Sequence, residues 1–130
     1  MFARHIAVVC LLAPVAAPTL AQTEPRAVVQ GQIAAYQARD IDRFVATFAP
    51  DAVVEFDRIR AVGPSQIRAL YSLNFAPAAP KVEVRGMVVE GARVRVEAAY
   101  RFANGNVLCC SVSQFTVGGD KVTRLVVTMP

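Results

Sequence analysis

The spacing of apolar residues changes once along the chain, from a helical period to a period of two. Between residues 24 and 75, apolar side chains recur three or four positions apart, as they do on one face of a helix. This spacing predicts three helices, at about 24–38, 41–48 and 65–75, with residues 51–56 as a short strand among them.

From Lys81 onward, apolar and polar residues alternate, which is typical of strands buried on one face. The alternation predicts four strands, with a bulge at Gly86 and a two-residue hairpin turn at Asn104-Gly105. Helices followed by consecutive strands imply an α+β domain, in which three helices cover one face of a curved, mainly antiparallel sheet and leave a cone-shaped pocket. The predicted strands span 82–91, 92–102, 106–117 and 121–129.

The N-terminus has the pattern of a secretory signal peptide. A short basic start precedes an apolar run of about a dozen residues, and small residues lead to Ala21. The run is broken by Pro14 and is shorter than the roughly 20 residues that cross a bilayer. We therefore expect residues 1–21 to direct export, and a mature single domain at 22–130 that is periplasmic or extracellular and not bound to a membrane.

The mature chain would hold no histidine, because the single one, His5, lies in the predicted signal peptide. Imidazole is the usual general base, nucleophile partner and zinc ligand near neutral pH. We therefore expect no metal and no cofactor, and any chemistry must come from carboxylates, tyrosines, arginines or thiols.

Two further patterns concern partners and redox chemistry. Arg93, Arg95 and Arg101 form a basic row on one side of a strand whose aromatic residues face the other way, so nucleic-acid binding is not expected. Cys109 and Cys110 are neighbours in a predicted strand, where their side chains point to opposite faces. A disulfide between them would need a distorted backbone, so we expect reduced packing residues, with a redox switch or an intersubunit bridge as alternatives.

Three segments carry a family resemblance: AYQARDIDRFVATFAPDAVVEF, VGPSQIRALY and QFTVGGDKVTRL. Their order and spacing across residues 32–125 resemble the SnoaL-like and ketosteroid-isomerase-like branch of the nuclear transport factor 2-like superfamily. The resemblance implies the same helix-and-sheet fold, and a homodimer formed through the outer face of the sheet. It implies no single activity, because the superfamily includes isomerases, dehydratases, cyclases and domains that only bind or assemble.

The resemblance also assigns positions to the isomerase's catalytic groups, which are a carboxylate base and an oxyanion hole made of a tyrosine and a protonated aspartate. The base position falls at Phe56, the tyrosine near Gln32 and the second acid near Ser113. A phenyl ring cannot accept a proton. Ketosteroid-isomerase chemistry in its usual form is therefore not expected.

The segment DAVVEFDRIR carries the nearest carboxylates to that base position. Strand alternation turns Arg58 toward the pocket and Asp57 away from it. A bulge or the end of the strand could rotate Asp57 back, so Asp57 and Tyr36 are the candidates for weak acid/base chemistry. The predicted ligand pocket consists of Gln32, Val54, Phe56, Arg58, Tyr71, Tyr100, Ser111, Ser113, Phe115, Leu125 and Val127.

The sequence thus favours an exported domain that binds a small, largely apolar molecule, without turnover or with weak acid/base chemistry. One alternative is a non-catalytic structural or dimerisation module whose cavity is filled by its own aromatic side chains. Another is an isomerase or hydratase that acts on a cyclic ketone-type substrate.

Overall fold

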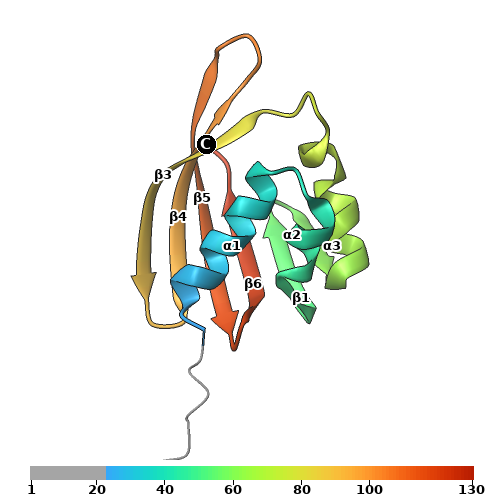
Figure 1. Ribbon diagram of the computed structural model, residues 1–130, viewed down its shortest axis with the longest axis vertical. Coiled ribbons are helices and arrows are strands. Elements are labelled where there is room, and N and C mark those ends of the chain that lie inside the picture. The colour runs from blue at the N-terminus through green and yellow to red at the C-terminus, as the bar shows by residue number, and fades with distance from the viewer. Residues whose placement is uncertain (1–22) are drawn as a thin grey trace, which may run out of the picture.

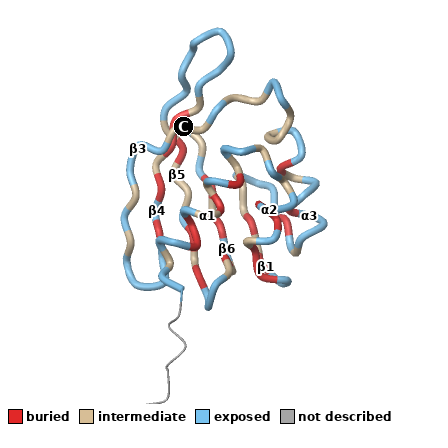
Figure 2. The backbone as a smooth tube through the Cα atoms, in the orientation of Figure 1, coloured by how far each residue is buried: buried red, intermediate tan, exposed pale blue. Residues whose placement is uncertain are grey.

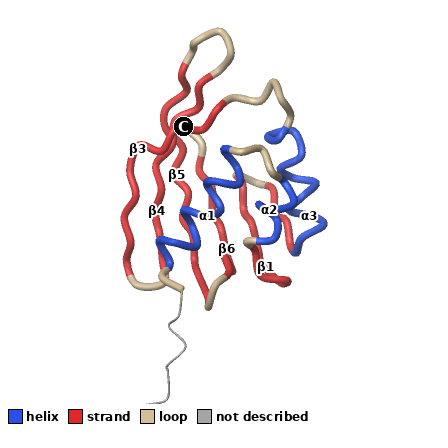
Figure 3. The backbone as a smooth tube through the Cα atoms, in the orientation of Figure 1, coloured by secondary structure: helices blue, strands red, loops and turns tan. Residues whose placement is uncertain are grey.

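The computed structural model describes residues 23–130, so the predicted signal peptide lies outside the described residues. The helices are α1 (Pro25–Gln37), α2 (Ile41–Ala46) and α3 (Gly63–Tyr71), and a 3₁₀ turn, η1 (Ser72–Phe75), continues α3. The strands are β1 (Phe48–Phe56), β2 (Ile59–Val62), β3 (Lys81–Glu90), β4 (Arg93–Arg101), β5 (Val107–Gly118) and β6 (Lys121–Thr128). The predicted α+β class and its element order are confirmed (Figures 1 and 3).

The six strands form one mixed sheet in the order β2-β1-β6-β5-β4-β3. Every neighbouring pair is antiparallel except β1 and β6, which run parallel. α1 packs against β3 to β6, while α2 and α3 pack near β1 (Figure 1). The buried positions follow the middle strands and the sides of the helices that face them, so the core lies between the two layers (Figure 2).

One of the hairpin turns differs from the prediction, whereas Gly119-Asp120 forms the turn expected between β5 and β6. At Asn104-Gly105, Phe102 N–H donates to the Asn106 carbonyl, which leaves a three-residue loop, and of these three residues only Gly105 has a positive φ. The expected two-residue turn, which needs positive φ at both central positions, is therefore wrong. A two-residue turn occurs instead after β1, where Phe56 pairs with Ile59 and Asp57 takes a φ of 52°. Aspartate tolerates this conformation better than most residues do.

β2 was not expected from the sequence, because its four residues are too few to establish an alternation. It pairs with β1 and forms one edge of the sheet, and β3 forms the other.

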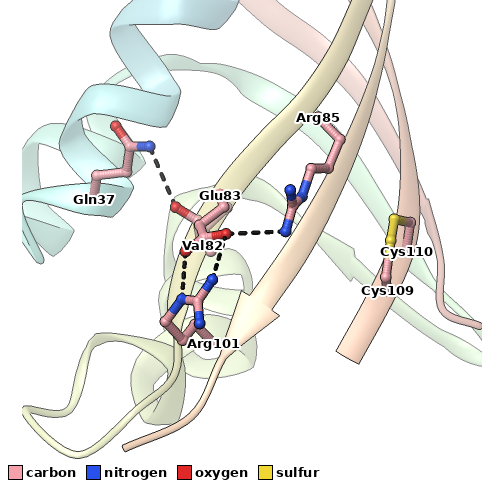
Figure 4. A network of polar contacts seen from close by, with 7 residues as sticks. All are labelled: Gln37, Val82, Glu83, Arg85, Arg101, Cys109 and Cys110. Carbon is pink, nitrogen blue, oxygen red and sulfur yellow. Dashed lines mark hydrogen bonds and ion pairs between the residues drawn. A yellow bond between two sulfur atoms is a disulfide. The ribbon is translucent and has the colours of Figure 1, made fainter. Parts of the chain in front are cut away.

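The predicted bulge in β3 is confirmed by the register shift between Val84 and Gly86. Next to the bulge, Arg101 and Arg85 donate to Glu83 at 2.6 and 3.1 Å (Figure 4), and the hydrogen bond from Arg101 lowers the pKa of the Glu83 carboxyl.

The expectation of reduced cysteines is wrong. Cys109 and Cys110 are joined by a disulfide on β5 (Figure 4). The peptide bond between them is cis. None of the helices within residues 23–130 has the length and hydropathy needed to cross a membrane.

Candidate functional site

A cavity of about 70 Å³ lies between the helices and the face of the sheet that they cover, and it is partly open to solvent. Most of its wall is apolar or aromatic, and its polar groups are neutral amides and hydroxyls. We call this space the inner cavity. Its lining residues are Gln32, Ile33, Tyr36, Phe44, Phe56, Tyr71, Asn74, Val82, Val84, Val96, Ala98, Tyr100, Ser113, Phe115, Leu125 and Val127.

The three positions that the resemblance assigned to isomerase groups lie in the wall of this one cavity. Gln32 comes from α1, Phe56 from the end of β1 and Ser113 from the middle of β5. None of them carries a carboxylate or a phenol. The three positions therefore provide an amide, a phenyl ring and a hydroxyl in place of the groups that the resemblance assigned to them.

Gln32 is held by a short chain of hydrogen bonds. Its side chain is buried, and Nε2 donates to Thr47 Oγ1 at 3.1 Å. The Thr47 hydroxyl in turn donates to the Phe44 carbonyl at 2.6 Å. The amide orientation is therefore fixed by the backbone at the end of α2, and among residues 23–130 no donor occupies the Gln32 amide oxygen. That oxygen is available to a donor in the cavity.

Tyr36 presents a neutral phenol to the cavity. Its hydroxyl accepts a hydrogen bond from Asn74 Nδ2 at 3.0 Å. Burial raises the pKa of Tyr36 to about 12, and the Asn74 hydrogen bond offsets only part of that effect. The phenol therefore keeps its proton near neutral pH and can donate a hydrogen bond to a ligand. Its suggested part in acid/base chemistry stays a prediction.

The other two tyrosines lie deeper or are already paired. Tyr71 is buried and packs against Phe44 with ring centroids 4.8 Å apart, and burial raises the pKa of its phenol. The Tyr100 hydroxyl lies 3.0 Å from Ser111 Oγ, which is itself buried. Tyr100 lines the cavity, whereas Ser111 lies behind it and supports the phenol.

Rings pack closely on the helix side of the cavity. Phe44 contacts four other rings, at centroid distances from 4.8 to 5.7 Å, in edge-to-face or tilted arrangements. Such geometries are the favourable ones for aromatic pairs. This side of the cavity is rigidly packed.

Four of the predicted site residues do not line the cavity, and two of these, Asp57 and Arg58, lie at the surface. The expectation that Arg58 faces the pocket is wrong, because β1 ends at Phe56 and its alternation does not continue. Asp57 and Arg58 form the turn into β2, and both are exposed. Asp57 is therefore not placed to exchange a proton with a molecule in the inner cavity. Its neighbour Glu55 points to the other face and accepts from Arg124 at 2.9 Å.

The remaining predicted residues either line the inner cavity or are buried behind its wall. Gln32, Tyr36, Phe56, Tyr71, Tyr100, Ser113, Phe115, Leu125 and Val127 line the inner cavity. Val54 and Ser111 are fully buried but do not reach it.

Several lining residues were missed from the sequence. Val96 and Ala98 share the inward alternation of Tyr100, so the same pattern could have found them. Asn74 could not have been found that way, because it lies in a 3₁₀ turn and its partner is 38 positions earlier.

Within residues 23–130, the structure brings together no group of three or more histidine, cysteine, aspartate or glutamate side chains that could hold a metal ion. No aspartate, glutamate, lysine or arginine of this part of the chain lines the inner cavity. The wall can orient a ligand by hydrogen bonds and apolar contacts, and it offers no carboxylate for proton abstraction.

The sequence pattern of the SnoaL-like domain matches residues 29–125, most of the chain. The chain belongs to the SnoaL-like domain family. No curated protein matches it. The family assignment confirms the resemblance found in the sequence, and it places the inner cavity in a SnoaL-like fold.

Solved structures agree with this assignment. A candidate polyketide cyclase from Sinorhizobium meliloti has a TM-score of 0.70 at 24% identity, covering 82% of this chain and 100% of its own. An NTF-2 like protein of unknown function from Burkholderia xenovorans scores 0.68 at 24% identity, covering 81% of each chain. A candidate ketosteroid isomerase from Kribbella flavida scores 0.72 at 18% identity, covering 82% and 77%. At these identities the likeness shows a common fold.

Proposed function

We propose that this SnoaL-like domain binds a small, largely apolar molecule in the inner cavity. The observation that carries the proposal is the composition of the wall: apolar and aromatic side chains surround a few neutral polar groups. Ligand sites in proteins commonly combine a mostly apolar wall with a small number of polar groups that fix orientation. Gln32, Tyr36 and Ser113 provide those groups here.

The size of the cavity limits what it can hold. A cavity of about 150 Å³ holds benzene, and sites for drug-sized ligands measure about 300–1,000 Å³. At about 70 Å³, the inner cavity takes a narrow group such as an alkyl chain, in the conformation described. A fused ring system would require the packed rings around Phe44 to move apart.

The same small volume favours a second candidate, a structural or dimerisation module whose cavity is largely filled by its own side chains. Phe44, Phe56 and Phe115 all line the cavity, and the space left between the lining side chains is about 70 Å³. An isomerase or hydratase has less support, because a proton acceptor would have to come from outside the described lining. The names of the cyclase and isomerase relatives suggest such activities without supplying that group here.

A matched pair of variants tests binding. We expect 1-octanol to raise the melting temperature of the protein, since a ligand at 100 times its Kd adds about 2.7 kcal/mol of stability. Ser113→Leu places bulk in the cavity and should abolish the effect. Gln114→Leu changes the next residue, which is exposed on the opposite face of β5, and should leave it intact. No stabilisation of the unmodified protein, or equal effects in both variants, would favour the structural module.

Two further proposals rest on the sequence pattern and the family. We propose that the protein is exported with cleavage after Ala21, which N-terminal sequencing of the secreted product would check.

We also propose a homodimer through the outer face of the sheet, which carries Arg95 and Glu97 as an ion pair at 3.1 Å. A monomer by analytical ultracentrifugation would overturn the second proposal.

A further inference from the structure

A second cavity, of about 310 Å³, adjoins the inner cavity. It is lined by Tyr36, Gln37, Arg39, Pro80, Lys81 and Val82. We call it the outer cavity. Tyr36 and Val82 line both spaces, so the two cavities are neighbours that share part of their walls. Gln37 Nε2 donates to the Val82 carbonyl at 3.3 Å and links α1 to β3 beside the outer cavity (Figure 4).

The outer cavity differs from the inner one in charge. It has two cationic side chains, Arg39 and Lys81, and no carboxylate in its wall. Within residues 23–130, neither cation forms an ion pair. The nearest acidic residues in sequence are engaged elsewhere: Asp40 accepts from the Arg43 backbone N–H, and Glu83 accepts from Arg101 and Arg85.

Arg39 is held in place before any ligand arrives. It follows the last turn of α1 with a φ of 55°, and its guanidinium donates to the carbonyls of Asn74, Ala76 and Ala79. These bonds use three of the five N–H groups of the guanidinium and leave one on Nε and one on Nη2. A carboxylate is the anion whose two oxygens match such a pair of donors.

We propose that the two cavities form one site for an amphipathic carboxylate. An alkyl chain occupies the inner cavity, passes Tyr36, and places its carboxylate at Arg39 and Lys81 in the outer cavity. This inference rests on the proposed function and adds the anionic end of the ligand to it. The small inner volume favours the arrangement, because a ligand of ordinary size must extend beyond the inner cavity.

Isothermal titration calorimetry with octanoate and 1-octanol tests the inference, because the two differ only in the charged group. We expect octanoate to bind about tenfold tighter at low salt, as a charge-assisted hydrogen bond would give. The preference should shrink in 0.5 M NaCl, which screens a partly exposed charge. Lys81→Gln should reduce the octanoate preference, with Arg39 retaining part of it, and leave 1-octanol binding unchanged.

The control is Lys121→Gln, the same substitution at a lysine that lies outside both cavities and donates to the Ala46 carbonyl. It should leave both affinities unchanged. Equal affinities for octanoate and 1-octanol, or equal effects of the two lysine variants, would overturn the carboxylate site and leave the proposed apolar function standing. Failure of both compounds to bind would overturn the proposed function itself.

Discussion

Arg39 allows a direct measurement of two opposing contributions to stability. Its left-handed backbone is unfavourable for any residue with a Cβ, by about 1–2 kcal/mol. Its guanidinium hydrogen bonds to the carbonyls of Asn74 in η1 and of Ala76 and Ala79 just after it act in the opposite direction. Hydrogen bonds to charged groups contribute about 1.5–3 kcal/mol each when well buried, and Arg39 is half-exposed, so we assign about 1 kcal/mol to each.

Two substitutions separate these contributions. Arg39→Ala loses the hydrogen bonds and keeps the unfavourable backbone, so its free energy of unfolding should fall by about 2–3 kcal/mol. Arg39→Gly loses the same bonds but relieves the backbone. Glycine also gains entropy in the unfolded chain, so the net relief is about 1 kcal/mol or less, and the fall should be about 1–2 kcal/mol.

Urea unfolding of the three proteins provides the assay, with the midpoint and the slope both recorded. Each kcal/mol should correspond to roughly 4–8 °C in melting temperature for a domain of about this size. If Arg39→Gly is as stable as the unmodified protein, the three bonds together contribute only as much as the backbone relief, about 1 kcal/mol or less, and the larger contribution assigned to them is refuted. If Arg39→Ala is more stable than Arg39→Gly, the account of the left-handed backbone is refuted.

Three further predictions concern other parts of the domain. Phe44→Ala should lower the free energy of unfolding in urea by about 4–5 kcal/mol, because it removes a buried ring that packs against four others. Phe102→Ala, at the exposed hairpin, should lower it by under about 1 kcal/mol. Similar losses in the two variants would contradict the packing described. Neutral Tyr36 contributes its full stability below its unfolded pKa near 10, and this contribution, about 2–3 kcal/mol, is lost as the pH rises toward 12. The free energy of unfolding of Tyr36→Phe should therefore fall less between pH 9 and pH 12 than that of the unmodified protein. Identical profiles of unfolding free energy against pH would refute this. Asp40→Ala should lower the free energy of unfolding by about 1 kcal/mol in thermal unfolding, because the carboxylate caps α2 by accepting from the Arg43 N–H. Asp40→Asn should keep most of this stability, since an amide oxygen also caps a helix. An equal loss in both variants would mean that the cap is not the cause.

The layer architecture was predictable because it follows from local periods. The change from helical spacing to alternation near Lys81 locates the boundary between the helical half and the four long strands. The inward face of β4 and β5 was equally accessible, since alternation alone assigns Tyr100, Ser113 and Phe115 to one side.

Alternation failed where a strand ended. Arg58 was assigned to the pocket by continuing the period of β1 past Phe56, but the chain turns at Asp57. No local pattern distinguishes a strand's last residue from its next, unless a turn residue such as Gly-Asn or Asn-Gly marks it. Asp57-Arg58 is a weaker turn signal, so the alternation predicts that the strand continues through these two residues.

The outer cavity was not predictable for a different reason. Arg39, Lys81 and Tyr36 come from two elements about 40 positions apart, and only the packing of α1 against β3 brings them together. Two of the three carbonyls that hold Arg39, those of Ala76 and Ala79, belong to a proline-rich segment, which the sequence marks only as a connection.

The place of β6 in the sheet determines when the domain can be completed during protein synthesis. β6 is made after the other five strands, yet it lies between β1 and β5 and joins the two halves of the sheet. Before residues 121–128 leave the ribosome, β1 with β2 and β3 to β5 share no strand pairing, and Leu125 and Val127 are missing from the cavity wall. Pairing β1 with a strand so distant in sequence closes a long loop, which is a slow step. We therefore expect the domain to fold as a whole only once residues 121–128 are available, and a chain that lacks them to expose the apolar wall that β6 completes.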